Sequence, residues 1–251
     1  MYQIKPLLLA TVAAEKGPMT YLAYHGQPVI RPYVMWYIRA GDKNVLIDSA
    51  IEAEDYRLSH PAFEHMPFKV VQSFTQALGS VGCIPDDIDI IIQTHLHLDH
   101  MYNSEKCHNA KIYVQEKELD FALKPHPIFE IFYAREKIRK LDFKVINGDQ
   151  IILPGIEVML APGHTPGCQS VVVDTVKGKA FITGCCTIMD NFTTEKDSKK
   201  RVSPFATHPA IAPGIHTNLF DAYESVIKIS RLADIIIPMH DSELSLRKTL
   251  P

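Results

Sequence analysis

The segment IIQTHLHLDHMYN, residues 91–103, concentrates side chains that are typical metal ligands. His95, His97, Asp99 and His100 follow directly after the apolar run DIDIII. Imidazole nitrogens and carboxylate oxygens are donors that zinc and related divalent metals bind. His95 and His97 are two residues apart, so in an extended segment their side chains point the same way. Asp99 and His100 follow a turn, so one metal could bind the first pair and a second metal the other pair.

A cluster of polar surface residues is the alternative interpretation of this segment. Residues 87–94, DIDIIIQT, however, predict a short buried strand directly before it. Functional sites in α/β folds gather at the carboxyl ends of such strands. The position therefore favours metal binding over a surface cluster.

Apolar runs that resemble strands alternate with helical patterns along the chain, which indicates α/β layers. Residues 34–50 predict two strands around a turn at Gly41 and Asp42, and residues 7–14 predict a first core strand. Further strands are expected within residues 149–163, 170–184 and 233–240, and residues 110–123 predict a strand followed by a helix. Residues 68–78 and 219–233 predict amphipathic helices, and residues 193–205 an exposed loop. The absence of repeats and low-complexity linkers favours one domain over residues 1–251.

Composition excludes several classes of protein. The 251 residues are 46% apolar and 22% charged, as in soluble globular proteins, and the net charge of −3 gives no reason to expect nucleic acid or an anionic membrane as partner. Residues 7–14 lack the flanking features of a signal peptide, and no apolar run reaches the length of a membrane span. Five cysteines without framework spacing, Cys83, Cys107, Cys168, Cys185 and Cys186, favour a reducing compartment. We therefore expect a cytoplasmic protein.

HLHLDH, residues 95–100, resembles the H-x-H-x-D-H signature of the metallo-β-lactamase superfamily. Three further segments resemble its later signatures in the same order: residues 154–170 with His164, residues 181–191 around Cys185, and residues 235–241 with His240. The resemblance implies an αβ/βα sandwich of two mixed sheets with helices outside and metals at one edge. It also implies that the small residues Gly163 and Gly167 let the His164 loop approach the metal.

The resemblance implies two divalent metal ions, zinc being expected and iron or manganese the alternatives. His95, His97 and His164 would bind one metal, and Asp99, His100 and His240 the other. Cys185 stands where the superfamily has a bridging aspartate. Its thiolate could replace the carboxylate, and a structural role in the core is the alternative.

The sequence indicates less specific roles for several other residues. Asp149 and Asp241 could hydrogen-bond to ligand histidines or lie in turns, and His216 could belong to the site. Five histidines that match no motif are expected at the surface or in turns: His25, His60, His65, His108 and His126.

Residues 20–41, 126–138 and 213–225 resemble the quorum-quenching lactonases, which open N-acyl homoserine lactones, and related small-lactone hydrolases. Phe129, Phe132 and Tyr133 would then line a substrate cleft or a subunit contact, or pack a helix. The implied reaction is metal-assisted hydrolysis of a lactone, in which Asp99 is both ligand and proton carrier. Penicillins are not expected as substrates.

Ile188 departs from these lactonases, which commonly carry an oxyanion-stabilising tyrosine there. Tyr24, Tyr33, Tyr102 and His216 are candidates to replace it; otherwise the substrate is a different, small polar or heteroaromatic lactone, which we favour. A thioesterase of the glyoxalase kind, a hydrolase of another cyclic ester or amide, a di-iron redox enzyme and a non-catalytic binding module are the competing functions. The expected partner is a small-molecule substrate, without nucleic acid or membrane, and assembly as a homodimer is left open.

Overall fold

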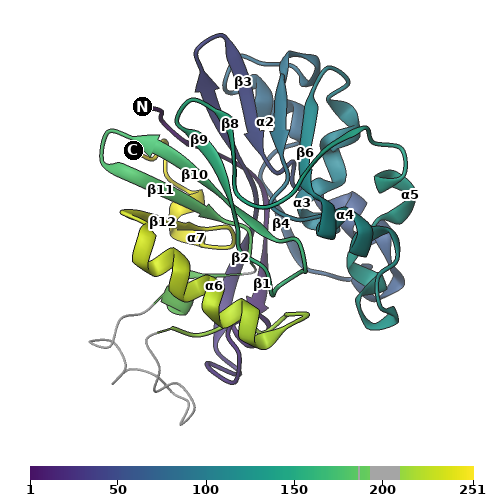
Figure 1. Ribbon diagram of the computed structural model, residues 1–251. Helices are drawn as coiled ribbons and strands as arrows, with labels where there is room; N and C mark the ends of the chain where they lie inside the picture. The colour runs from purple at the N-terminus through teal and green to yellow at the C-terminus, as the bar shows by residue number, and fades with distance from the viewer. Residues whose placement is uncertain (186, 193–209) are drawn as a thin grey trace.

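Two mixed β-sheets lie face to face in the computed structural model, which describes residues 1–185, 187–192 and 210–251 (Figure 1). Helices cover the outer faces, so the predicted αβ/βα sandwich is confirmed. Cys186 and the predicted loop at residues 193–205 lie outside the described residues.

The first sheet has seven strands in the order β4-β1-β2-β3-β5-β6-β7. Its strands are β1 (Lys5–Glu15), β2 (Pro28–Ala40), β3 (Lys43–Ile47), β4 (Phe68–Val70), β5 (Ile90–Ile92), β6 (Lys111–Gln115) and β7 (Phe143–Ile146). The pairs β3–β5, β5–β6 and β6–β7 are parallel, and the other pairs are antiparallel. The parallel half brings the carboxyl ends of β3 and β5 to one edge, where the histidine-rich segment begins.

The second sheet has five strands in the order β12-β11-β10-β9-β8. They are β8 (Gln150–Leu153), β9 (Ile156–Leu160), β10 (Gln169–Thr175), β11 (Gly178–Thr183) and β12 (Ile235–Pro238). Only the β11–β12 pair is parallel. This pairing carries the chain from β12 to His240 at the same edge as the end of β11.

Among the described residues, all helices are short except for α6. They are α1 (Ala53–Ser59), α2 (Phe74–Gly79), α3 (Leu98–Met101), α4 (Glu116–Leu123), α5 (Arg135–Ile138), α6 (Leu219–Leu232) and α7 (Ser242–Ser245), with 3-10 turns at Gly17–Met19, Pro61–Phe63, Pro85–Asp87, Tyr102–Lys106, Pro127–Phe132 and Met189–Phe192. Figure 1 shows α6 on the outer side of the second sheet and α2 and α4 beyond the first. No helix among the described residues is both long and apolar enough to cross a bilayer.

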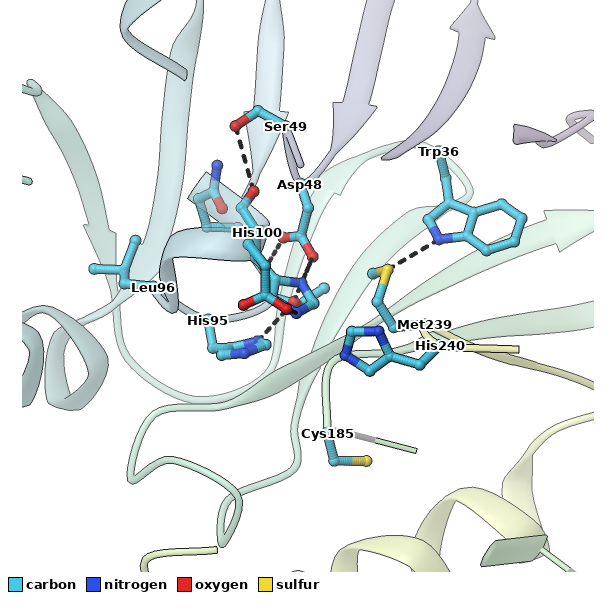
Figure 2. A network of polar contacts seen from close by, with 12 residues as sticks. Trp36, Asp48, Ser49, His95, Leu96, His100, Cys185, Met239 and His240 are labelled. Carbon is cyan, nitrogen blue, oxygen red and sulfur yellow. Dashed lines mark hydrogen bonds and ion pairs between the residues drawn. The ribbon is translucent and has the colours of Figure 1, made fainter. Parts of the chain in front are cut away.

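The main core lies between the sheets. Trp36, Ile47 and Ile92 of the first sheet pack with Val171 and Ile182 of the second, all nearly inaccessible to solvent. Burial of each such side chain contributes about 1.5–3 kcal/mol, which is why every one of these strands carries an apolar inner face. The indole Nε1 of Trp36 also contacts the Met239 sulfur at 3.1 Å, next to His240 (Figure 2).

The predicted helix over residues 68–78 is partly wrong. Phe68–Val70 forms the edge strand β4, which pairs with β1, and the helix begins only at Phe74. Ser73 and Gln76 form a reciprocal capping box that fixes this start. Phe68–Val70 therefore forms a strand instead of helix, because the edge of β1 offers it backbone hydrogen-bond partners. The other predicted strands and the late helix are confirmed.

Candidate metal centre

Two groups of metal-binding side chains lie at the edge of the sandwich. The first consists of His95, His97 and His164, and the second of Asp99, His100 and His240. Within each group the potential ligand atoms lie within 4.8 Å of one another. The structure thus brings together six of the seven residues predicted as ligands, in the two sets that the resemblance implies.

The chain positions these side chains through the ends of strands. His95 and His97 lie in the extended segment after β5, whereas Asp99 and His100 lie in α3, which starts directly afterwards. His164 lies in the loop between β9 and β10, and His240 follows β12. The turn from extended chain to helix separates the two pairs, as the spacing predicts.

The first group presents free ring nitrogens to a common centre. The Nδ1 atoms of His95 and His164 lie 3.1 Å from the Thr94 hydroxyl and 2.7 Å from the Ile215 carbonyl, so their Nε2 atoms face each other at 3.3 Å. The Nε2 atom of His97 is buried without a hydrogen-bond partner. A buried polar atom is costly unless something binds it, so these three nitrogens fit a metal ion.

Burial keeps this group neutral. Desolvation, helped by the positive charge of neighbouring histidines, holds the pKa of His95 and of His97 well below the usual range. The pKa of His164 is lowered to about 4, mainly by burial. Metals bind neutral imidazole, so the first group is ready for a cation at neutral pH without losing protons.

The second group carries more charge. Burial lowers the pKa of His240 to about 3, whereas the carboxylates of Asp99 and Asp48 outweigh burial and raise the pKa of His100. Burial alone would raise the pKa of Asp99, but the charges of His100, His240 and Arg31 together hold it below its usual value. Asp99 is therefore an ionised carboxylate at neutral pH.

Asp48 is a functional residue that the sequence analysis missed. Its buried carboxylate lies 2.7 Å from the Nδ1 atom of His100 (Figure 2). It also accepts hydrogen bonds from the backbone N–H and the hydroxyl of Thr94, both at 2.7 Å. Such a carboxylate fixes the ring orientation of a ligand histidine. The available signal was its position directly after the buried strand β3, in the segment LIDSA.

Glu118 is the second missed residue. Its fully buried carboxylate accepts hydrogen bonds from the N–H of Leu96 at 2.9 Å, the N–H of Gly167 at 3.2 Å and the hydroxyl of Thr165. Leu96 lies between two ligands, and Thr165 follows His164. Glu118 therefore joins the two loops that supply the first group, a link that no local pattern indicates.

The glycines of the His164 loop serve close packing against helices. A Cβ atom at Gly167 would lie 2.2 Å from the backbone nitrogen of Glu118 in α4. At Gly163, whose φ is +122°, it would lie 2.0 Å from the backbone nitrogen of Ala222 in α6. The neighbours that exclude a side chain at these two positions are therefore two helices, and the approach of the loop to the metal stays a prediction.

Aromatic rings and two cavities lie next to the two ligand groups. The rings of Phe132 and Tyr133 lie 5.0 and 4.9 Å from that of His97, between ring centroids. Tyr133 and Leu98 line a cavity of about 660 Å³. A second cavity, of about 520 Å³, is lined by His240 and Ile188 among others. Phe129 packs in the apolar cluster behind Tyr133.

Cys185 belongs to neither group among the described residues. Its side chain is buried with Met159, Phe181 and Val226, and burial raises the pKa of its thiol to about 11. Figure 2 shows its sulfur turned away from His95. This placement supports the alternative core role, and a metal-ligand role for Cys185 stays a prediction.

The remaining candidates lie outside the two groups. Asp149 accepts a hydrogen bond from the Leu160 N–H, and Asp241 caps α7, so both stabilise turns or helix ends. His216 bonds to the Pro213 carbonyl and packs on Tyr21. The five histidines expected at the surface, His25, His60, His65, His108 and His126, are all exposed, as predicted.

Known relatives share parts of this sequence. An N-acyl homoserine lactonase of Bacillus sp is 32% identical over 162 residues, which cover 64% of this chain and 56% of that protein. The N-acyl homoserine lactonase AttM of Rhizobium radiobacter is 26% identical over 184 residues, covering 68% of this chain and 65% of that protein. The chain thus spans less than two thirds of the length of these relatives.

Solved structures share the fold. An N-acyl homoserine lactone hydrolase with its product N-hexanoyl-L-homoserine superimposes with a TM-score of 0.73 at 22% identity, covering 96% of this chain and 94% of that one. AidC, a dizinc quorum-quenching lactonase, superimposes with a TM-score of 0.60 at 20% identity, covering 88% and 76%. The pattern of the Metallo-beta-lactamase superfamily matches residues 30–240, which is most of the sequence. The chain therefore belongs to the metallo-beta-lactamase superfamily.

Proposed function

We propose that this protein is a metal-dependent hydrolase that opens a small lactone. The observation that carries the proposal is the pair of adjacent ligand groups at the edge of the sandwich, each with three convergent donors. The N-acyl homoserine lactonases among its relatives support the same reaction class. We expect zinc in both groups, because imidazole nitrogens dominate the donor set.

The residues present define what the chain itself would contribute. His95, His97 and His164 would hold one ion, and Asp99, His100 and His240 the other. Such ions supply Lewis acidity, which lowers the pKa of a bound water to near neutrality and polarises an ester carbonyl. Asp48 would keep the His100 ring oriented throughout the reaction.

Asp99 is the proposed catalytic residue for proton transfer. Because it is ionised, its carboxylate can take the proton released when water adds to the lactone carbonyl. As the ring C–O bond breaks, Asp99 would transfer that proton to the departing alkoxide oxygen. The products are then a hydroxyl group and a carboxylic acid on one open chain, the acid releases its proton to solvent at neutral pH, and Asp99 is ionised again.

The test starts with metal analysis of purified protein and continues with a panel of lactones, cyclic amides, thioesters and penicillins at neutral pH. We expect about two divalent metal ions per chain, from the two groups, and turnover of at least one simple lactone. Thioester turnover without lactone turnover would move the protein to the thioesterase class. Efficient penicillin turnover would contradict the proposal by placing the protein in another branch of the superfamily. A purified protein without bound metal would refute the proposal altogether.

A further inference from the structure

The cavity of about 520 Å³ beside the second ligand group reaches one of the ligand residues. His240 lines it together with Ile188. The cavity of about 660 Å³ is different, because Leu98 and Tyr133 line it next to His97 but, among the described residues, no ligand does. A molecule bound in the cavity at His240 would therefore contact the second group itself.

The inner wall of the cavity at His240 is apolar. The buried residues of its lining are Ile188, Leu244 and His240 itself, with exposed fractions of 3%, 9% and 3%. Ile188 packs with Val29, a further residue of the lining, and with Met19, which is almost fully buried. An aliphatic group that enters this part of the cavity removes apolar surface from water, its own and that of the wall, which favours binding.

Hydrogen bonds hold Ile188 in this wall. Its N–H donates to the side-chain oxygen of Asn191 at 2.8 Å, and its carbonyl accepts from the Asn191 N–H at 3.0 Å. The buried side-chain amide of Asn191 donates to the carbonyls of Met19 at 2.7 Å and Ile211 at 2.9 Å. Ile188 is therefore fixed before a ligand arrives, so less entropy is lost when the ligand binds.

The charged residues of the lining lie toward solvent. Lys16 and Asp190 form an ion pair at 2.9 Å, and Asp241 accepts hydrogen bonds from two backbone N–H groups of α7. Glu243 and Arg247 are exposed. None of these five residues is buried, and both signs of charge are present. The cavity thus changes from an apolar interior to a mouth of mixed charge, which suits an alkyl chain better than an ionic group.

The proposed role of Asp99 determines which part of a lactone faces this cavity. Asp99 and His240 offer ligand atoms within 4.8 Å of each other, so an alkoxide oxygen that takes a proton from Asp99 departs close to His240. In a five-membered lactone that oxygen is bonded to the γ-carbon, whereas the α-carbon is attached on the other side of the carbonyl. A substituent on the γ-carbon therefore starts at the cavity, and one on the α-carbon starts on the opposite side of the ester group.

We propose that the cavity at His240 binds an alkyl substituent on the γ-carbon of the lactone, and that Ile188 is the specificity-determining residue of this subsite. The inference rests on the proposed lactonase function and narrows it to γ-alkyl lactones, in place of the polar or heteroaromatic lactone that the sequence favours. It also gives a role to Ile188, because an apolar side chain contacts the alkyl group where a phenol would bring a polar hydroxyl.

The test compares two lactones of the same composition, γ-pentyl-γ-butyrolactone and α-pentyl-γ-butyrolactone. The metal-loaded wild type should prefer the γ-pentyl isomer by about 10- to 100-fold in kcat/KM, a discrimination that an apolar pocket achieves with a change as small as one methylene. Ile188→Thr should reduce this preference about 10-fold, because it replaces part of the apolar wall with a hydroxyl. Ile188→Phe should reduce it as well, because the larger ring occupies the space of the pentyl group.

The control is Ile112→Thr, because Ile112 is also 3% exposed but packs in the separate cluster around Phe74 and Leu78. This variant should keep the preference for the γ-pentyl isomer. Metal content and circular dichroism establish that each variant is folded and loaded. Equal kcat/KM for the two isomers in the wild type would overturn the proposal. A preference that persists in both Ile188 variants, or that Ile112→Thr removes to the same extent, would overturn it as well.

A binding experiment separates this proposal from the lactonase function itself. The ring-opened products of the two isomers, γ-hydroxynonanoate and its α-pentyl isomer, are titrated calorimetrically into the metal-loaded wild type, Ile188→Thr and Ile112→Thr. We expect the wild type and Ile112→Thr to bind γ-hydroxynonanoate about 10-fold more tightly than its isomer, and Ile188→Thr to lose this difference. If no lactone is turned over but the Ile188-dependent difference is present, the lactonase proposal fails and the subsite stands. If binding does not distinguish the isomers, the subsite fails whatever the activity.

Discussion

The two ligand groups are adjacent, yet they are held in different ways. The first group is made of three imidazoles, and Glu118 fixes the loops around them through backbone and hydroxyl donors. The second group includes a carboxylate and is influenced by charged neighbours: Asp48 contacts His100, and the charge of Arg31 helps to lower the pKa of Asp99. One half of the centre is thus fixed mainly by loop geometry, and the other is tuned mainly by charge. We expect the first group to bind metal more tightly and the second to control the chemistry.

Removal of both metals should have the largest effect. Exhaustive chelation is expected to reduce hydrolysis to background and to lower the unfolding temperature, because bound metal stabilises only the folded state. Stepwise return of zinc, followed by calorimetry, should show two binding events, with activity restored mainly by the second. Full activity in protein verified as metal-free would show that neither group is used in catalysis.

His97→Ala breaks the first group directly. The variant loses a ligand, so its activity should fall by more than the roughly 10- to 100-fold that is typical for residues outside the ligand shell. Circular dichroism should show the fold kept, and metal analysis a loss from one site. His126→Ala, at an exposed histidine, is the matched control and should behave as wild type. Wild-type rate and metal content in His97→Ala would make the site assignment wrong.

Asp48→Asn tests how far charge controls the second group. The uncharged amide orients the His100 ring less firmly and raises the basicity of its metal-binding nitrogen less, so metal affinity of the second group should fall about 10- to 100-fold while the first group keeps its metal. Asp86→Asn is the control, because Asp86 makes a similar contact with His108 at the surface, at 2.8 Å. Equal weakening of both sites would show that the two groups are not held separately.

Glu118→Gln tests the loop link of the first group. Gln offers one acceptor oxygen where Glu118 offers two, so a backbone N–H of Leu96 or Gly167 should lose its partner. We expect a loss of about 1–3 kcal/mol in unfolding free energy and about 10-fold weaker metal binding at the first group alone. Glu116→Gln, two residues earlier on the exposed side of α4, should change neither quantity. Normal affinity at the first group in Glu118→Gln would contradict the link.

Cys185 should give the smallest effect on metal binding. Its thiol is packed among apolar side chains, so Cys185→Ser should cost about 1–3 kcal/mol of stability and leave both metals bound. Cys107→Ser, in a separate apolar cluster, provides a measure of that general cost. Selective loss of the second metal in Cys185→Ser, with recovery in Cys185→Asp, would instead establish the cysteine as the bridging ligand predicted from the sequence.

The sequence predicts the ligands of this centre better than it predicts their support. His95, His97, Asp99 and His100 lie within six residues, so local spacing is enough to identify them. Asp48 contacts His100, which is 52 positions away in the sequence, and Glu118 contacts Leu96, which is 22 positions away. No local pattern contains such contacts. A distant contact also explains why residues 68–78 predict one helix. The strand that pairs with Phe68–Val70 is β1, which is more than 50 residues away in the sequence.

The spread of the ligands along the chain has a consequence for biosynthesis. The first ligand is His95 and the last is His240, and β12, which positions the last, joins its sheet beside β11. On the ribosome, the growing chain would carry three imidazoles and Asp99 long before their partners are synthesised. Contacts between distant residues form late and slowly. The second group is therefore complete only after His240 has been synthesised and β12 has paired with β11, and a metal captured earlier would be held by an incomplete ligand set and would exchange readily.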